Sequence, residues 1–261
     1  MGNDFLKVSL IQADVKWHDI DYNLQMFDRL IDEGAGDADL FVLPEMFSTG
    51  FTMSPETVAE NMDGKAVSWI VAKSKAAGAA IAGSVIVEDG GSYFNRLLFA
   101  LPNGELYTYD KRHLFRMGNE HNHYKAGDKR LVVTYKGWRI CPLICYDLRF
   151  PVWSRNQNDY DLLIYIASWP AARRFPWESL LVARAIENQC YVVGVNRVGV
   201  DGAGLSYSGD SAAIDAKGAY IAKLDANAER VASVSLSLKA LYDFREKFPV
   251  MLDGDSFEII G

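Results

Sequence analysis

The stretch Leu40-Phe41-Val42-Leu43-Pro44-Glu45 decides the fold, because an unbroken apolar run ends abruptly at a proline and a carboxylate. A short apolar run bounded by a turn is typical of a β-strand that is covered on both faces. A second run of this kind, Leu162 to Ala167, is followed closely by Trp169-Pro170. Strands covered on both faces belong to α/β proteins, in which helices pack on a sheet. The two runs therefore predict an α/β fold with candidate functional residues at the ends of its central strands.

Strand and helix patterns alternate along the rest of the chain. Apolar residues recur at helical spacing between Asp21, the expected N-cap, and Gly34, the expected stop. Further helices are expected over residues 66–77 and 177–189. Strands are expected over residues 7–12, 40–43, 81–87, 93–101, 106–109, 131–135, 138–144, 162–167, 191–196, 212–214, 220–224 and 231–236. This order predicts a mixed sheet, or two sheets, covered by helices. Because no repeat or Pro/Gly/Ser-rich linker divides the chain, one domain is expected over residues 1–261.

The composition is that of an ordinary folded protein. Of the 261 residues, 49% are hydrophobic and 23% are charged, which excludes an intrinsically disordered chain. The formal net charge is −7, so neither nucleic acid nor an anionic membrane is expected as a partner, and no apolar run is long enough for a membrane span. The 3 cysteines are an odd number, and no Asn-x-Ser/Thr site is present. This pattern indicates free thiols in a reducing compartment, and hence a cytoplasmic protein.

Cys145 is the first candidate for chemistry, because it stands where the apolar strand 138–144 turns into an expected helix. The N–H groups at a helix N-terminus stabilise a thiolate, which is the nucleophilic form of cysteine. The alternative is a buried structural cysteine. Cys141 and Cys190 lie among apolar neighbours in strands, and they are interpreted as structural.

Glu45 and Lys111 are two further candidates. Glu45 closes an apolar strand, where a partly desolvated carboxyl group is suited to proton transfer. The alternative is a solvated loop glutamate. Lys111 follows the Asn103-Gly104 hairpin, and a lysine beside a reacting carbonyl stabilises an oxyanion and helps to keep a neighbouring thiol ionised. Its alternative is a surface lysine in a basic patch.

Five segments that contain or follow these residues together resemble the nitrilase superfamily of carbon–nitrogen hydrolases. They are Leu43-Pro44-Glu45-Met46-Phe47, Tyr109-Asp110-Lys111-Arg112-His113-Leu114-Phe115, Cys145-Tyr146-Asp147-Leu148-Arg149-Phe150-Pro151, Ala183-Arg184-Ala185-Ile186-Glu187-Asn188-Gln189 and Asn196-Arg197-Val198-Gly199. The resemblance extends from about Lys7 to about Leu236. It implies a four-layer α-β-β-α sandwich, assembly into homodimers or larger homo-oligomers, a small-molecule amide as substrate, and no cofactor.

The resemblance also implies a role for each matching residue. Cys145 is the nucleophile, Glu45 the general base and acid, and Lys111 the oxyanion stabiliser. Glu120 is expected to orient Lys111 or the substrate, and the backbone N–H of Tyr146 is expected to share the oxyanion. The implied reaction is amide hydrolysis through a thioester on Cys145, in which Glu45 protonates the departing ammonia.

Within the superfamily, three stretches look most like the bacterial omega-amidases: residues 111–115, 119–127 and 169–173. The omega-amidase branch hydrolyses 2-oxoglutaramate to 2-oxoglutarate and ammonia. A pocket for this substrate needs a cation for the α-keto carboxylate, ideally a bidentate arginine. Arg173 is the predicted cation, and its rivals are Arg149, Arg174 and Lys125.

Alternative interpretations exist for the residues that line the pocket and for the exact activity. Trp169 and Phe115 are expected to line the pocket, although core packing is an equal alternative for either aromatic ring. Another nitrilase-type activity, such as that of an N-carbamoyl amide hydrolase or an aliphatic nitrilase, is the second interpretation, and a catalytically silent scaffold is the third. Because no Cys-x-x-Cys pair is present, no metal site is expected from His121, His123, Cys141 and Cys145.

Overall fold

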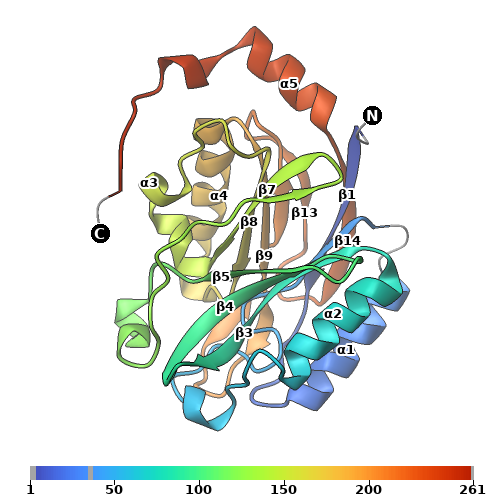
Figure 1. Ribbon diagram of the computed structural model, residues 1–261, viewed down its shortest axis with the longest axis vertical. Coiled ribbons are helices and arrows are strands. Elements are labelled where there is room, and N and C mark those ends of the chain that lie inside the picture. The colour runs from blue at the N-terminus through green and yellow to red at the C-terminus, as the bar shows by residue number, and fades with distance from the viewer. Residues whose placement is uncertain (1–3, 35–37, 260–261) are drawn as a thin grey trace.

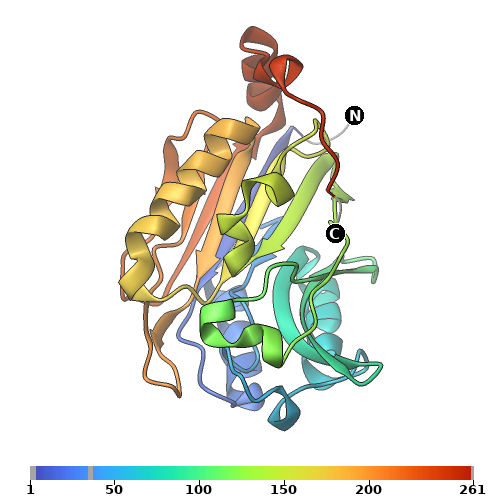
Figure 2. The ribbon, with the colours of Figure 1, turned by 90° about the vertical axis from the view of Figure 1, so that its left-hand side faces the viewer.

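In the computed structural model, two six-stranded β-sheets pack face to face, and helices cover the outer face of each sheet (Figure 1). The structure describes residues 4–34 and 38–259. Figure 2 shows the layers from the side, in the order helix, sheet, sheet, helix. The predicted α-β-β-α sandwich is therefore confirmed.

The first sheet has the strand order β14-β1-β2-β3-β4-β5. Its strands are β1 (Phe5–Gln12), β2 (Leu40–Val42), β3 (Ala80–Asp89), β4 (Ser92–Ala100), β5 (Leu106–Asp110) and β14 (Arg230–Ser237). Helices α1 (Ile20–Gly34) and α2 (Lys65–Ala77) pack on its outer face.

The second sheet has the strand order β13-β12-β9-β8-β7-β6. Its strands are β6 (Val133–Tyr135), β7 (Trp138–Ile144), β8 (Leu162–Ala167), β9 (Tyr191–Asn196), β12 (Ala212–Ile214) and β13 (Tyr220–Lys223). Its outer side carries α3 (Pro151–Ser154) and α4 (Arg174–Asn188).

Strand β2 shows why an unbroken apolar run is needed in this architecture. Leu40 and Val42 face the core between the two sheets, whereas Phe41 and Leu43 face the core beneath α1 and α2. Successive side chains of a strand point to opposite faces, so every side chain of a strand between two cores faces an apolar environment. The interpretation of this run as a strand covered on both faces is confirmed.

The central strands of each sheet run parallel, and their carboxyl ends meet at one edge of the sandwich. In the first sheet β1, β2 and β3 pair in parallel, as do β7, β8 and β9 in the second. Glu45 follows β2 in the first sheet, while Cys145 and Ser168 directly follow β7 and β8 in the second. The backbone N–H of Ser168 donates to Oε2 of Glu45 at 2.8 Å, so the two sets of strand ends are in direct contact.

Two local predictions differ from the structure. Helix α1 begins at Ile20, and Asp19 rather than Asp21 accepts the N–H of a first-turn residue, Tyr22, at 3.1 Å. The chain after Cys145 is a short 3₁₀ turn, Cys145–Arg149, and not the expected helix. Pro151 then starts α3, because proline is favoured at the first positions of a helix.

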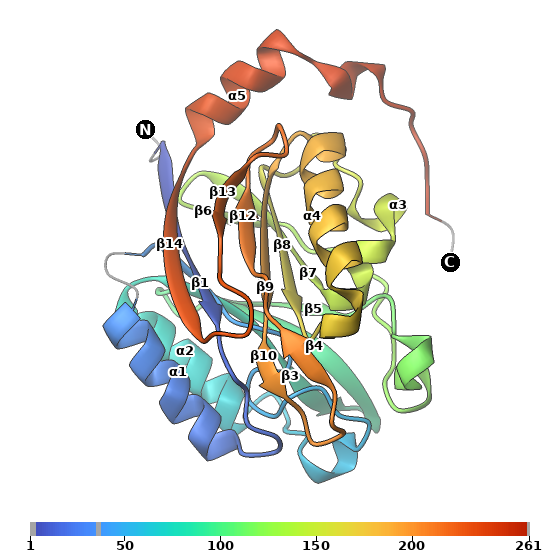
Figure 3. The ribbon, with the colours of Figure 1, turned by 180° about the vertical axis from the view of Figure 1, so that it is seen from behind.

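A two-stranded sheet and a helix near the end of the chain were not predicted. A separate two-stranded sheet joins β10 (Val198–Val200) to β11 (Ser206–Ser208). Helix α5 (Leu238–Lys247) extends past the end of the sandwich (Figure 3), and its N-cap Ser237 accepts the N–H of Ala240 at 3.1 Å. Among the helices of the described residues, none combines the length and the apolar character that crossing a membrane requires.

Candidate active site

Two sharp backbone corners carry the candidate residues at the strand ends. Met46, next to Glu45, has φ 47°, and Cys145 itself has φ 44°. Non-glycine residues rarely adopt positive φ, so both corners hold strained backbone. The Met46 N–H donates to Oγ of Ser84 at 2.8 Å, which fixes the first corner. A sharp turn after a strand presents the side chain at the strand end instead of returning it to the core.

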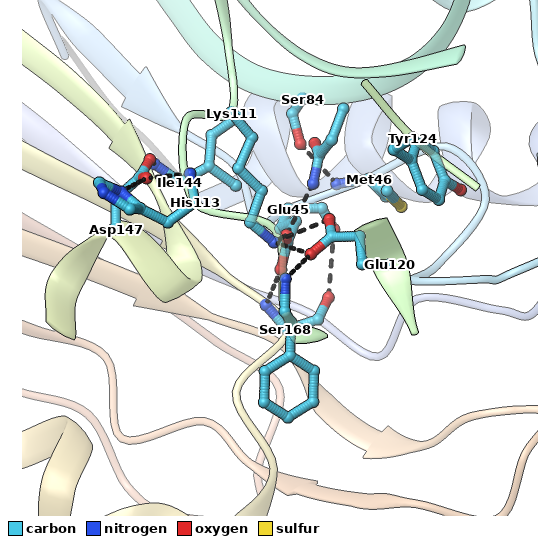
Figure 4. A network of polar contacts seen from close by, with 12 residues as sticks. Glu45, Met46, Ser84, Lys111, His113, Glu120, Tyr124, Ile144, Asp147 and Ser168 are labelled. Carbon is cyan, nitrogen blue, oxygen red and sulfur yellow. Dashed lines mark hydrogen bonds and ion pairs between the residues drawn. The ribbon is translucent and has the colours of Figure 1, made fainter. Parts of the chain in front are cut away.

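Asp147 holds the second corner in place and is completely buried. Its Oδ2 accepts the N–H of Ile144 at 3.0 Å and the hydroxyl of Tyr109 at 2.7 Å. Its Oδ1 accepts the backbone N–H of His113 at 3.0 Å and contacts the His113 ring at 2.8 Å (Figure 4). The carboxylate therefore ties the turn that contains Cys145 to the loop that follows Lys111.

Glu45 is fully buried and nearly saturated with hydrogen bonds. Its Oε1 accepts from Asn95 Nδ2 at 2.7 Å and from Lys111 Nζ at 2.9 Å. Its Oε2 accepts the N–H of Ser168 at 2.8 Å (Figure 4). A carboxylate has about four lone-pair positions, and three are occupied here. The position that is left, on Oε2, is available for a proton.

Lys111 lies between two carboxylates. Its Nζ is 2.9 Å from Glu45 and 2.9 Å from both carboxylate oxygens of Glu120 (Figure 4). Burial alone would lower the pKa of Lys111, but the charges of Glu120 and Glu45 outweigh it, so the net shift is upward and the ammonium stays charged. Burial raises the pKa of Glu120, and this carboxyl group also accepts the N–H of Phe115. Glu120 is thus in direct contact with Lys111, and its role in orienting this lysine stays a prediction.

Cys145 forms part of the wall of a cavity, and only 8% of its surface is exposed. Burial raises the pKa of its thiol well above the usual range, the charge of Glu45 raises it further, and Lys111 opposes the shift. The expectation that Lys111 and a helix N-terminus keep this thiol ionised is therefore wrong for the resting site. The turn is too short to act as a helix terminus, and burial together with Glu45 outweighs the lysine.

The cavity beside Cys145 opens to solvent, and its empty space is about 420 Å³ when the open mouth is included. All four predicted substrate-binding residues line it, namely Phe115, Tyr146, Trp169 and Arg173. The sequence had not singled out several other lining residues, namely Phe51, Ser168, Pro170, Leu205 and Tyr207.

The structure shows which of the four candidate cations lie at the cavity. Arg173 and Arg149 both line the cavity, and their guanidinium groups lie over the rings of Phe115 and Trp169, at 5.2 and 4.8 Å from the ring centroids. Within residues 4–34 and 38–259, neither guanidinium has an ion-pair partner. Arg174, by contrast, pairs with Glu178 and Asp210, and Lys125 lies at a different surface hollow. Arg149 thus joins Arg173 as a cation of this cavity.

The other cysteines take no part in the site. Cys141 and Cys190 are fully buried in the core, and all three cysteines are free thiols. In the part of the chain that the structure describes, no group of three His, Cys, Asp or Glu side chains has the arrangement of a metal site.

Asn95 and Asp147 are the supporting residues that the sequence did not reveal. Asn95 stands in the middle of an apolar strand, and only the pairing of β4 with its neighbours brings it to Glu45, 50 residues earlier in the chain. Asp147 is two positions from Cys145, and its spacing gave a signal that could have been used. A short polar residue three positions after a strand-ending Ile144 can accept the free N–H of that residue.

This site belongs to a known class of hydrolases. The carbon-nitrogen hydrolase family model matches residues 7–246, so the chain belongs to the carbon–nitrogen hydrolase family of the nitrilase superfamily and is a hydrolase that acts on carbon–nitrogen bonds. It is 50% identical over 254 residues to the omega-amidase YafV of Escherichia coli (strain K12), covering 97% of this chain and 98% of that protein.

Two further relatives agree with this assignment. The 2-oxoglutaramate amidase of Bacillus subtilis (strain 168) is 33% identical, covering 94% of this chain and 96% of that protein. The crystal structure of XC1258 from Xanthomonas campestris, a CN-hydrolase superfamily protein with an arsenic adduct in its active site, superposes with a TM-score of 0.95. Its sequence is 48% identical, and the match covers 98% of this chain and 99% of that one.

Proposed function

We propose that this protein is an omega-amidase that converts 2-oxoglutaramate to 2-oxoglutarate and ammonia. The observation that carries the proposal is the hydrogen-bonded group Glu45, Lys111 and Glu120, placed beside Cys145 at a cavity that also contains Arg149 and Arg173. Two of the relatives are named for this activity, one as an omega-amidase and one as a 2-oxoglutaramate amidase.

Acylation begins with proton transfer from Cys145 to Oε2 of Glu45. The sulfur attacks the amide carbonyl carbon, a carbon–sulfur bond forms, and the carbonyl electron pair moves to oxygen. The hydrogen bond from Lys111 to Oε1 of Glu45 weakens when Glu45 becomes neutral, because an uncharged carboxyl group is the poorer acceptor. The ammonium group and the N–H of Tyr146 then stabilise the oxyanion.

The tetrahedral intermediate collapses to a thioester, and the carbon–nitrogen bond breaks as Glu45 returns its proton to the nitrogen. The amino group cannot leave as an amide anion and must be protonated to leave as ammonia, so one carboxyl group acts first as base and then as acid. Water enters next, gives a proton to Glu45 and attacks the thioester. The carbon–sulfur bond then breaks, Glu45 returns the proton to the sulfur of Cys145, and the acid leaves. The high pKa of the resting thiol explains why a base must stand beside it.

Arg173 and Arg149 are the residues proposed to bind the carboxylate at the end of the substrate away from the amide. An arginine side chain presents two parallel N–H donors, which match the geometry of a carboxylate. The aromatic rings under both guanidinium groups hold them in place without neutralising them. A free carboxylate several bonds from the amide is therefore the feature that this cavity should select.

The direct test is the release of ammonia from a panel of 2-oxoglutaramate, glutamine and an N-carbamoyl compound. We expect the wild type to prefer 2-oxoglutaramate and Cys145→Ala to release none. Release from the carbamoyl compound alone would favour the second interpretation, an N-carbamoyl amide hydrolase. A wild type that releases ammonia from none of these compounds would favour the catalytically silent scaffold.

The arginine assignment needs its own comparison. Arg173→Ala and Arg149→Ala should lower kcat/KM for 2-oxoglutaramate by about 10²-fold each, since a charged hydrogen bond contributes about 1.5–3 kcal/mol. Neither change should affect a neutral short-chain amide by the same factor. Arg174→Ala is the matched control, because its ion pairs lie outside the cavity. An unchanged preference between the two substrates would remove that arginine from the role.

The intermediate can be observed directly. Mass spectrometry after acid quenching should show an acyl group on Cys145 and none on Cys141 or Cys190. The arsenic adduct in the active site of the Xanthomonas campestris relative fits this expectation, because arsenic reacts readily with thiols. Assembly into a homodimer or larger homo-oligomer and a cytoplasmic location are part of the same proposal, and sedimentation and cell fractionation test them.

A further inference from the structure

Asn95 is a fully buried polar residue in the middle of β4, and its side chain reaches only one group. Its Nδ2 donates to Oε1 of Glu45 at 2.7 Å, while its Oδ1 has no hydrogen-bond partner among the described residues. The amide must be oriented this way, because a charged carboxylate accepts hydrogen bonds and donates none. A leucine at this position would fill a similar space and remove the unsatisfied Oδ1, but it would also remove one hydrogen bond to the charged Glu45. The contact of the amide with Glu45 is therefore the feature that distinguishes asparagine from leucine here.

The two oxygens of Glu45 are not equivalent. Oε1 faces two N–H donors, from Asn95 and from Lys111, whereas Oε2 faces only the N–H of Ser168. A proton placed on Oε1 would displace one of these donors, so Oε1 favours the negative charge. Oε2 is left as the oxygen that can take up a proton.

From this asymmetry we infer that Asn95 is a positioning residue, whose amide fixes Oε1 as the charged oxygen of Glu45 and so directs proton transfer through Oε2. This inference rests on the proposed function. In each turnover the thiol proton of Cys145 moves to Oε2, the carbon–sulfur bond forms, and the same proton leaves with nitrogen as the carbon–nitrogen bond breaks.

The backbone of Asn95 supports the same arrangement. Its carbonyl oxygen accepts the N–H of Lys111 at 3.0 Å, so one residue holds Glu45 through its side chain and Lys111 through its main chain. A side-chain substitution removes only the first of these contacts. The effect of the amide on Glu45 can therefore be measured with the lysine still in place.

The surroundings of Glu45 define what a pH profile can report. The titratable groups that face it are Lys111, Glu120 and Cys145, with Tyr124 and Tyr207 also close enough to feel charge in the site. Asn95→Leu leaves all five groups unchanged. Loss of the amide donor makes the charged carboxylate less favourable, so the acid limb of kcat/KM should move to higher pH.

The experiment compares Asn95→Leu, Asn95→Asp and the control Leu97→Val, a substitution in the same strand and the same core. Ammonia release from 2-oxoglutaramate is measured across the pH range, and the unfolding temperature is measured for each variant. For Asn95→Leu we expect the acid limb to move up by about one pH unit. Leu97→Val should lower the unfolding temperature and leave the limb in place.

Asn95→Asp carries the test if the leucine variant does not fold, because it keeps the shape of the side chain and replaces a donor by a second carboxyl group. We expect it to lose more activity at neutral pH than Asn95→Leu. An active wild type with an unmoved acid limb in these variants overturns the inference alone. A limb that moves equally in Leu97→Val also overturns it. A wild type that releases no ammonia overturns the proposed function, and the inference with it.

Discussion

Cys141 and Cys145 stand four positions apart, yet the middle of β7 and its carboxyl end give them opposite environments. Cys141 pairs in register with Leu163 of β8 and is sealed in the core, where burial raises the pKa of its thiol to about 12. Burial also raises the pKa of the Cys145 thiol, but Glu45, Lys111 and a cavity lie beside it. The difference shows that burial makes both thiols inert, and that an adjacent proton acceptor with open space makes one of them usable.

The largest loss of activity should come from replacing one of these two cysteines, Cys145, by alanine. Cys145→Ala removes the proposed nucleophile, and we expect kcat for 2-oxoglutaramate to fall by about 10⁴-fold or more. Cys141→Ala should leave kcat within about twofold, because this thiol contacts no reacting group. Steady-state ammonia release measures both variants. Comparable losses in the two would show that the end of β7 is not special.

Removing the cation should have the next largest effect. Lys111→Met leaves Glu45 and Glu120 as buried carboxylates without their counter-charge, and it removes the proposed oxyanion donor. We expect kcat to fall by about 10²–10³-fold and the free energy of unfolding to fall by about 3–5 kcal/mol. Lys125→Met is the control, since Lys125 is exposed and remote from the cavity. Activity near the wild-type value in Lys111→Met would remove the lysine from the mechanism.

The backbone corner gives a smaller effect. Asp147→Asn turns an amide N–H group toward the donors that the carboxylate now accepts, which loosens the turn carrying Cys145. We expect a loss of about 10²-fold in kcat, because misplacing a reacting group by 1 Å has that order of effect. Asp243→Asn, which removes half of an exposed ion pair on α5, should change nothing. Equal kinetics in the two variants would contradict a positioning role for Asp147.

The smallest effect concerns stability at alkaline pH. The pKa of Cys141 is raised to about 12 from a reference of 9.0, so above pH 9 the unfolded chain loses this proton while the folded chain keeps it. Stability contributed by the protonated thiol is therefore present below pH 9 and declines as the pH rises toward 12. Between pH 9 and pH 10 the loss for this one thiol is about 1 kcal/mol. Urea unfolding should show a correspondingly shallower decline in Cys141→Ala, and an identical slope would argue against the shift.

The fold was predictable where a single stretch of sequence contains the signal. The apolar runs Leu40 to Leu43 and Leu162 to Ala167 each identify a strand between two cores without any other part of the chain. Helix α5 was missed, because its exposed position past the sandwich leaves only Leu241 fully buried and so a weak apolar stripe. The turn after Cys145 was mistaken for a helix, since both begin with the same local pattern.

The residues of the candidate site also divide into those that the sequence could predict and those that it could not. Glu45, Lys111 and Cys145 could be selected from their places at strand ends and from the resemblance to the superfamily. Asn95 and Ser168 could not, because their contacts with Glu45 depend on strand pairing and on how one sheet lies over the other. The direction of the Cys145 pKa shift also depends on burial in three dimensions, which no local pattern reports.

Glu45 and Lys111 come from one sheet, and Cys145 and Ser168 come from the other. The group that we propose to be catalytic therefore exists only while the two sheets keep their alignment. The rate of turnover therefore reports how well the two sheets are aligned with each other. We expect a mild denaturant that loosens this alignment to abolish ammonia release while the circular dichroism spectrum of the strands and helices stays unchanged.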